Sequence, residues 1–181
     1  LLLDNKENIE KLEKIKNDFS KLMEKEMQLM WAKKLGAEKY NDTLTNELFN
    51  LMIISKTDFT IFFRKLSNIP DDISLLKESF YLPLNEELDE KWNIWLKKWQ
   101  GCIKTHNDPK KISQSMKKVN PKYTWREWMI VPAYEEAEEG NYNLIHELQS
   151  ILSNPYEEQS IEISQKYNQL KPREFFNNGG I

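Results

Sequence analysis

The chain has 181 residues, of which 39% are hydrophobic and 30% are charged, and its formal net charge at pH 7 is −3. This composition is typical of a soluble globular protein and excludes a disordered one. The small net charge gives no electrostatic reason to expect nucleic acid or an anionic membrane as a partner. No apolar run approaches the roughly 20 residues of a membrane-spanning helix, and no targeting segment is visible.

Glycine and cysteine are both rare. With five glycines and apolar residues at helical spacing throughout, the sequence predicts an all-α fold, an irregular bundle of several helices. The single cysteine, Cys102, cannot form an internal disulfide, and we expect it to be a small buried side chain. Cys102 and His106 have the spacing of two metal ligands on a helix, but a structural zinc site usually takes four ligands. We therefore expect no metal site.

Residues 4–35 are predicted to form one long helix that is capped by Asp4 and ended by Gly36. Apolar side chains recur along it at spacings of three and four residues and are expected to face a core, while the charged face is solvated. They are Ile9, Leu12, Phe19, Leu22, Met23, Met27 and Met30. A coiled-coil partner on this stripe is the alternative, which the drift and short length of the stripe disfavour.

Two further helices are predicted at 42–54 and from Asp58 through Leu66. In the first, the inward-facing residues are expected to be Leu44, Leu48, Phe49, Met52 and Ile53. Asp58, or Thr57 before it, is expected to cap the second. Asp58-Phe59 also resembles the start of a kinase metal motif, but that site needs a preceding strand, a catalytic loop and a glycine-rich loop, which are absent upstream.

A short helix is predicted at 71–80, and a longer one at 85–104 carries Trp92, Trp95 and Trp99 on one face. We expect the three indoles to pack against a neighbouring helix and their N–H groups to find acceptors. An exposed tryptophan face that binds a partner is the alternative.

A helix capped by Asp108, with Pro109 at its first position, is predicted to run through Lys117. The break at Asn120-Pro121 follows, because the residue before a proline is pushed out of the α region.

A helix hairpin is predicted next. Thr124 to Glu127 has the capping-box pattern of a helix start, and Gly140 suits the left-handed position that ends that helix. Asn141 or Asn143 is expected to cap the second helix, which Asn154-Pro155 closes. Its apolar face contains Leu144, Ile145, Leu148, Ile151 and Leu152.

We expect residues 1–181 to form a single helical domain, with a helical core at about 42–159 and a loosely ordered tail at about 160–181, where the periodicity is lost. The tail residues expected to pack down are Ile161, Ile163, Tyr167, Phe175 and Phe176.

No catalytic motif is visible: the sequence has no glycine-rich phosphate loop and no local Ser/His/Asp or Cys/His signature. We expect structural roles for Arg64, Tyr123, Arg126 and Glu127. The two arginines should tie neighbouring helices together through carboxylate or carbonyl oxygens, and Tyr123 should pack at the entrance of the hairpin. The residues by themselves therefore predict no catalytic, cofactor-binding or metal-binding residue.

Several short motifs occur in an order that resembles the C-terminal part of the SelO (selenoprotein O) family of kinase-like proteins, which transfer AMP from ATP to protein hydroxyls. The motifs are Met30-Trp31-Ala32-Lys33-Lys34-Leu35-Gly36, Asp58-Phe59-Thr60-x-Phe62-Phe63-Arg64-x-Leu66, Trp92-x-x-Trp95-Leu96, Met116-x-x-Val119-Asn120-Pro121-Lys122-Tyr123, Ala137-Glu138-x-Gly140 and Asn154-Pro155-Tyr156-Glu157-Glu158-Gln159. Gly140-Asn141 departs from the family's Gly-Asp pair, and the C-terminal tail lacks the cysteine or selenocysteine that members often carry.

The resemblance implies a full-length parent of kinase-like (pseudokinase) architecture that binds ATP with Mg²⁺ and adenylylates Ser, Thr or Tyr hydroxyls. The ATP- and metal-binding residues of the family lie upstream of every matched motif. The resemblance therefore implies no catalytic residue here, and a chain that is inactive alone. Its implied partners are the missing N-terminal kinase-like lobes, against which the tryptophan face would pack, and the protein substrates of the parent. The implied location is mitochondrial, as in eukaryotic members, and otherwise cytoplasmic. A stand-alone helical interaction module that uses the Trp92/Trp95/Trp99 face is the alternative.

Overall fold

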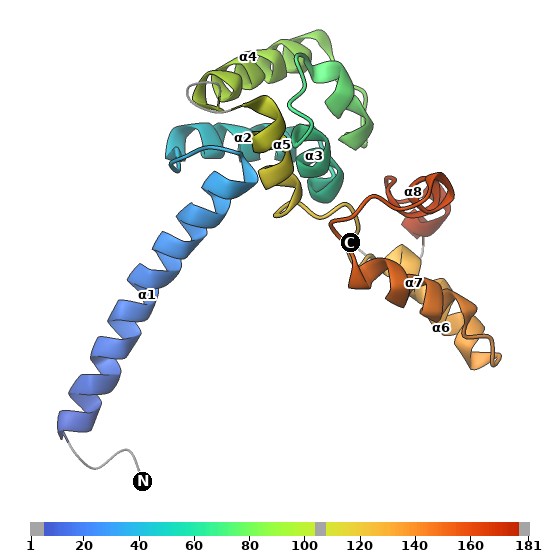
Figure 1. Cartoon of the computed structure of the whole chain (residues 1–181), viewed down its shortest axis with the longest axis horizontal. Coiled ribbons are helices and arrows are strands. Elements are labelled where there is room, and N and C mark those ends of the chain that lie inside the picture. The colour runs from blue at the N-terminus through green and yellow to red at the C-terminus, as the bar shows by residue number, and fades with distance from the viewer. Residues whose placement is uncertain (1–5, 104–107, 178–181) are drawn as a thin grey trace.

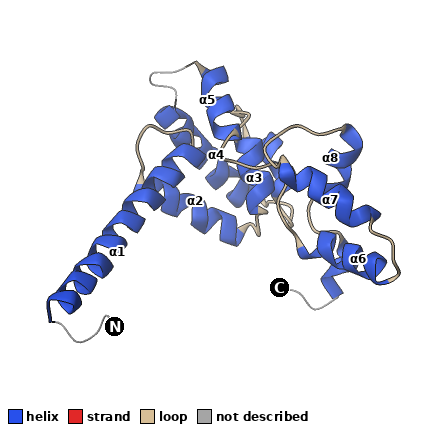
Figure 2. Ribbon diagram, turned by 60° about the horizontal axis from the view of Figure 1, so that its bottom comes forward, coloured by secondary structure: helices blue, strands red, loops and turns tan. Residues whose placement is uncertain are grey.

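The computed structural model describes residues 6–103 and 108–177 and is helical throughout (Figure 1). The α-helices are α1 (Lys6–Lys34), α2 (Asp42–Ile54), α3 (Phe59–Leu66), α4 (Glu86–Ile103), α5 (Pro109–Lys117), α6 (Glu127–Glu138), α7 (Asn143–Ser153) and α8 (Ile161–Tyr167), and two 3-10 segments are η1 (Ile73–Ser79) and η2 (Arg173–Asn177). Within these two described ranges no strand occurs, as Figure 2 also shows. The prediction of an all-α fold is confirmed.

Polar side chains and glycines set most helix boundaries. Asp58 Oδ1 accepts a hydrogen bond from the Ile61 N–H at 3.0 Å, so Asp58 rather than Thr57 caps α3. Asp108 caps α5 in the same way, with Pro109 at the first helical position. Gly36 and Gly140 have φ of 66° and 84° and end α1 and α6 in the left-handed conformation that glycine adopts without strain.

The predicted capping box at Thr124 to Glu127 is wrong. α6 begins at Glu127, and the residue before it, Arg126, has an extended backbone and no side-chain cap bond. The Arg126 side chain is in an ion pair with Asp58. Glu127 itself is exposed. In the next helix the predicted cap is also wrong, because the residue at the cap position of α7 is Tyr142, which makes no side-chain cap bond. Asn141, one residue earlier, accepts a hydrogen bond through its Oδ1 from the Asn143 N–H at 3.1 Å.

The first apolar core lies among α2, α3, η1, α4 and α5. Its centre is the tryptophan stripe of α4, where Trp92, Trp95 and Trp99 are 0%, 1% and 0% exposed. Each indole N–H donates to an acceptor on another element, at 2.8 Å to Ser55 Oγ, 2.9 Å to the Leu44 carbonyl and 2.8 Å to the Leu35 carbonyl, respectively.

The stripe is therefore the packed core that the helical spacing predicts. The alternative, a partner-binding face made of these three residues, is wrong because none of them reaches the surface. For the same reason they offer no surface to missing lobes.

The second apolar core lies between the α6–α7 hairpin and α8, which stand apart from the α2–α5 group in Figure 1. Its buried residues are Tyr123, Trp128, Met129, Ala133, Leu148, Ile151 and Tyr167. Leu144, Ile145 and Leu152 of α7 pack against it, as predicted. The single-domain assignment of residues 1–181 stays a prediction.

One predicted core position in α2 and one in α4 are exposed. Ile53 is 74% exposed, and Leu51 is buried in its place, because Ile53 lies about 140° around α2 from the fully buried Leu48. Cys102, predicted to be buried, is exposed in the last turn of α4. His106 lies outside the described residues.

The tail contains more regular structure than the loss of periodicity predicts. α8 is capped by Ser160, whose Oγ accepts from the Ile163 N–H at 3.2 Å. Tyr167 is buried in the second core and its hydroxyl donates to Glu147, while Ile163 and Phe175 pack partly against that core. These elements are too short to show a helical repeat in the sequence. The predicted packing is wrong for Ile161 and Phe176, which are exposed.

The largest departure concerns α1. All seven residues predicted to face a core along this helix are exposed, and among the described residues α1 reaches the first core through its C-terminal end, at Trp31, Ala32 and the following Leu35. In Figure 1 the rest of α1 extends away from the other helices.

Candidate functional site: a polar junction between two apolar cores

Polar side chains, several of them buried, gather where the two cores meet. Two connections meet there, one between α5 and α6 and one between α7 and α8, beside α3. We use the term polar junction for Asp58, Arg64, Asn120, Lys122, Tyr123, Arg126, Glu158 and Ser164.

Arg64 is the centre of the polar junction and is 5% exposed. Its Nη1 donates to the carbonyl oxygens of Lys117 and Asn120, both at 3.1 Å. Its Nη2 donates to the Tyr156 carbonyl at 3.1 Å and to Glu158 Oε1 at 2.7 Å. The planar guanidinium can serve these four acceptors at once, which a lysine ammonium cannot. One α3 side chain thus holds both connections.

Asn120 is 0% exposed and joins α1 and α3 to the first connection. Its Oδ1 accepts from Lys34 Nζ at 3.0 Å, and its Nδ2 donates to the Lys34 carbonyl at 2.9 Å and to Ser67 Oγ at 3.0 Å. The carboxamide therefore uses its acceptor and both of its donors. Burial lowers the pKa of Lys34, whose ammonium also lies 5.1 Å from the centre of the Phe63 ring.

Lys122 and Tyr123 connect the same segment to α8. Lys122 Nζ lies 2.6 Å from Glu158 Oε2 and 2.9 Å from Ser164 Oγ, and the Tyr123 hydroxyl shares a hydrogen bond of 3.0 Å with Ser164 Oγ. The Lys122 main-chain N–H donates to the Pro155 carbonyl at 2.8 Å. Tyr123 is 2% exposed and packs in the second core at the entrance of the hairpin, as predicted.

Glu158 pairs with two of the three cations of the polar junction, Arg64 and Lys122. Burial by itself raises the pKa of this carboxyl, but the hydrogen bonds and positive charges of Lys122 and Arg64 outweigh that effect and lower the pKa from 4.5 to about 2. The Glu158 side chain is 63% exposed, so solvent screens much of this attraction.

Arg126 forms a second ion pair across the polar junction. Its guanidinium binds both carboxylate oxygens of Asp58, with Nη2 at 2.9 Å from Oδ1, and both side chains are nearly buried. The same carboxylate caps α3, and the Asp58 N–H donates to the Ser79 carbonyl at 2.7 Å. Asp58 therefore links the start of α6 to the start of α3 and the end of η1. Both arginines make contacts of the kinds predicted for them, Arg64 to carbonyl oxygens and a carboxylate and Arg126 to a carboxylate.

The polar junction brings together four of the residues singled out from the sequence, namely Arg64, Asn120, Tyr123 and Arg126. Trp92, Trp95 and Trp99 lie in the first core, and Glu127 lies on the surface. Sequence reasoning assigned no part to Lys34, Lys122, Glu158 or Ser164, and the structural role that it gave Asp58 was that of a helix cap. The signal for Lys122 and Glu158 was their position inside matched motifs.

The chemistry of the polar junction is that of structural coupling. The donors of Arg64 and Asn120 point at main-chain carbonyls and at partner side chains that hold them in place. Across residues 6–103 and 108–177, no group of three or more His, Cys, Asp or Glu side chains could hold a metal ion. Within the same ranges no helix is long and apolar enough to cross a bilayer.

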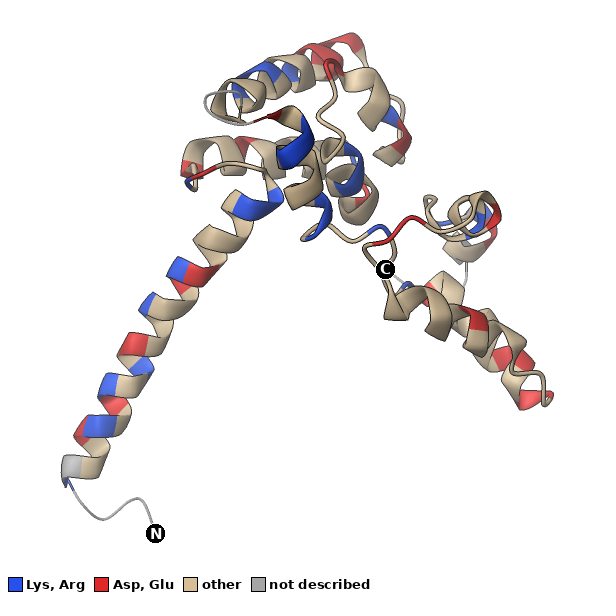
Figure 3. Cartoon of the chain, viewed as in Figure 1, with Lys and Arg blue, Asp and Glu red and all other residues tan. Residues whose placement is uncertain are grey.

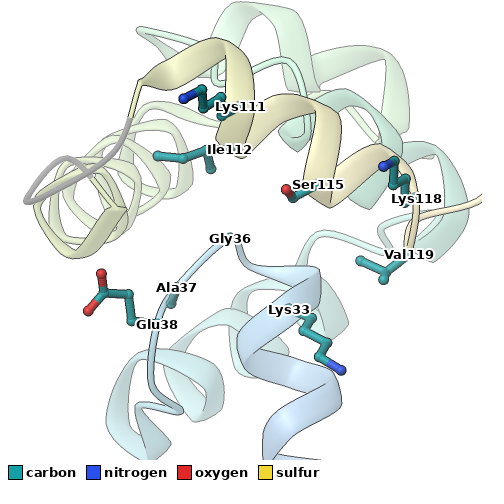
Figure 4. Close-up of a pocket in the computed structure, with 9 residues that line it drawn as sticks. All are labelled: Lys33, Gly36, Ala37, Glu38, Lys111, Ile112, Ser115, Lys118 and Val119. Carbon is teal, nitrogen blue, oxygen red and sulfur yellow. The ribbon is translucent and has the colours of Figure 1, made fainter.

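A shallow cleft of about 530 Å³ lies beside the polar junction, between the end of α1 and α5 (Figure 4). It is lined by Lys33, Gly36, Ala37, Glu38, Lys111, Ile112, Ser115, Lys118 and Val119. Gly36 is required where these elements meet, because a Cβ there would lie 2.6 Å from Met116 Sδ and 2.8 Å from Ile112 Cγ2. The α1–α5 contact thus depends on the glycine that ends α1.

Comparison with known proteins confirms the family that the motifs indicate. The family described as protein adenylyltransferase SelO matches residues 2–153. A protein nucleotidyltransferase YdiU from Flavobacterium johnsoniae is 34% identical over 83% of this chain and 31% of its own length. A YdiU from Methylobacillus flagellatus is 32% identical over 71% of this chain and 26% of its own length. The matches thus cover between about a quarter and a third of these relatives. The chain belongs to the SelO family of protein adenylyltransferases.

Proposed function

We propose that this chain is the C-terminal helical part of a longer SelO-type protein adenylyltransferase and that it does not transfer AMP by itself. The parent would transfer AMP from ATP, bound with Mg²⁺ in kinase-like lobes, to Ser, Thr or Tyr hydroxyls of protein substrates. A mitochondrial location for the parent rests only on the resemblance to eukaryotic members.

The observation that carries this proposal is how little of the relatives the match covers. The YdiU relatives from Methylobacillus flagellatus and Flavobacterium johnsoniae are matched over 26% and 31% of their length, so most of each relative has no counterpart here. Those relatives are named nucleotidyltransferases as whole proteins.

The polar junction supports a scaffold role for the matched part. Arg64 and Asn120 direct their hydrogen-bonding groups at carbonyls and at fixed partners. Groups held in this way set the orientation of the two cores. A general base or a phosphate-binding cation would instead have to direct a free group at a substrate.

The test is transfer of labelled AMP from α-labelled ATP to protein. This chain is compared with the longest native product of the same gene, at equal concentration and with Mg²⁺ present. We expect label in the reaction of the long product and none in that of this chain.

Two results would contradict the proposal. Label transferred by this chain alone would show that an active site lies within these 181 residues. No transfer by the long product, in assays where a YdiU relative is active, would remove the adenylyltransferase assignment.

A further inference from the structure

The exposed side of α1 is the largest apolar surface that the fold leaves unexplained. Nine large apolar side chains of this helix are between 38% and 64% exposed. We call them the α1 apolar face; they are Ile9, Leu12, Ile15, Phe19, Leu22, Met23, Met27, Leu29 and Met30. At about 1.5 Å per residue the face is roughly 32 Å long. Large contiguous apolar patches on soluble proteins usually mark a contact surface.

The α1 apolar face is one side of the helix and not a scatter of residues. At about 100° per residue, its nine members fall within roughly 160° of the helix circumference. Positively charged lysines and negatively charged Asp and Glu residues alternate along the rest of α1 (Figure 3). The helix therefore has the amphipathic form of an element that is covered on one side.

The first core of this chain does not provide that cover. The end of α1 docks through Trp31, Ala32 and the following Leu35, which lie about 120°, 140° and 160° around the helix from Phe19. The α1 apolar face thus points away from the side by which the helix is anchored. In proteins most of the stability of a helix comes from packing of its amphipathic face, and the first core does not provide that packing for most of α1.

We propose that the α1 apolar face is the surface on which the remainder of a longer SelO-type chain packs. This inference rests on the proposed function, since it takes its partner from the parent. The family match begins at residue 2, so α1 belongs to the matched sequence. The YdiU relatives that carry this match have more than two thirds of their length outside it.

The α1 apolar face also specifies the chemistry of its partner. Glu26 is exposed and lies only about 20° around the helix from Phe19, near the midline of the face. A carboxylate buried there without a partner is costly. The packing surface is therefore apolar with one Lys or Arg side chain, or a pair of main-chain N–H groups, opposite Glu26.

The experiment measures hydrogen exchange of the α1 amides in this chain and in the longest native product of the same gene. In this chain alone we expect fast exchange over residues 6–26, because the segment has few buried contacts. In the long product we expect exchange slower by about 100-fold or more, as for a helix packed into a core.

Two matched variants assign any protection to the face. Phe19→Asp places a carboxylate on the α1 apolar face, and Asn17→Asp places the same group about 160° away. In the long product, Phe19→Asp should speed α1 exchange by about 10-fold or more, and Asn17→Asp by less than about 2-fold. Thermal unfolding of this chain alone should be the same for both variants.

Three results would overturn the inference. One is equally fast α1 exchange in the two products. Another is slow exchange in the long product that Phe19→Asp leaves unchanged. The third is slow exchange in this chain alone, together with a dimer mass by light scattering that Phe19→Asp returns to a monomer, since the occupant would then be a second copy.

AMP transfer by the same long-product samples separates the two proposals. Protection of α1 without AMP transfer would contradict the adenylyltransferase function and leave the packing surface standing. AMP transfer without protection of α1 would contradict the packing surface and leave the adenylyltransferase function standing.

Discussion

Arg64→Lys is the sharpest test of the polar junction, because it keeps the positive charge and removes the planar, forked set of guanidinium N–H donors. Arg64 serves four acceptors, of which three are main-chain carbonyls. The lysine ammonium is more compact than the guanidinium fork and can reach about two of these four acceptors. Each lost hydrogen bond to a charged group costs about 1.5–3 kcal/mol, so losing two costs roughly 3 kcal/mol or more.

The assay is urea unfolding of this chain followed by circular dichroism, with thermal unfolding alongside. For a chain of this size a loss of about 3 kcal/mol corresponds to a fall in Tm of roughly 6–12 °C. Because Arg64 joins connections that belong to both cores, we also expect the single transition to broaden or separate into two steps. The second core should be the first to unfold, since it is the smaller of the two.

The control is Arg173→Lys, because Arg173 is exposed and lies in η2. This change should alter the free energy of unfolding by no more than about 0.5 kcal/mol. If Arg64→Lys also costs less than about 1 kcal/mol and leaves one sharp transition, the polar junction does not couple the two cores and the reasoning fails.

Three further predictions concern single features. The pKa of Glu158 is lowered to about 2, so this carboxylate stabilises the fold above pH 4.5 and the stabilisation is lost as the pH falls toward 2. Glu158→Gln should therefore make the free energy of unfolding in urea depend less on pH over that range, and an unchanged pH dependence would refute the pairing. Trp95→Ala should cost about 3–5 kcal/mol in urea unfolding, because the indole is buried and hydrogen-bonded, and a cost under about 1 kcal/mol, the range of surface sites, would contradict its place in the core. Gly36→Ala should cost about 1–3 kcal/mol, because φ is 66° and the new Cβ would meet Met116, whereas Gly101→Ala in α4, with open space around it, should be neutral or stabilising by thermal unfolding.

The parts of the fold that could be predicted from the sequence are those with local causes. Asp58 and Asp108 cap helices through hydrogen bonds that span two or three residues, and Gly36 and Gly140 end helices through their own φ angles. The tryptophan stripe repeats at helical spacing, and burial of large indoles is the usual outcome. The failure of the capping box at Thr124 has the opposite origin. Arg126 is engaged by Asp58, which lies 68 residues away in sequence.

For the same reason, the sequence allowed several residues of the polar junction to be singled out but not their contacts with one another to be predicted. Arg64 and Glu158 are separated by 94 residues, and Asn120 and Lys34 by 86. Each residue could be singled out within a motif, but no periodicity or spacing relates one motif to another across such distances. Pairing of this kind depends on how the helices pack, which the local sequence does not encode.

The prediction for α1 shows a different limit. Helical periodicity identified the apolar side of this helix correctly, but we assigned that side to a core of this chain. An apolar stripe indicates that one side of a helix is covered and does not indicate which part of the protein covers it. The described residues leave that side exposed, and the match to longer relatives suggests where the cover lies.

The end of α1 connects these two observations. Lys34 lies in the last turn of α1, and both its ammonium and its carbonyl are hydrogen-bonded to the Asn120 carboxamide. Asn120 is in turn held through its own carbonyl by Arg64, which also binds the segment before α8. Directional hydrogen bonds of this kind fix an orientation that apolar contacts alone would leave free to slide. Whatever packs along α1 is therefore placed relative to both cores at once, so a change at Asn120 should alter the position of the α1 apolar face without touching it.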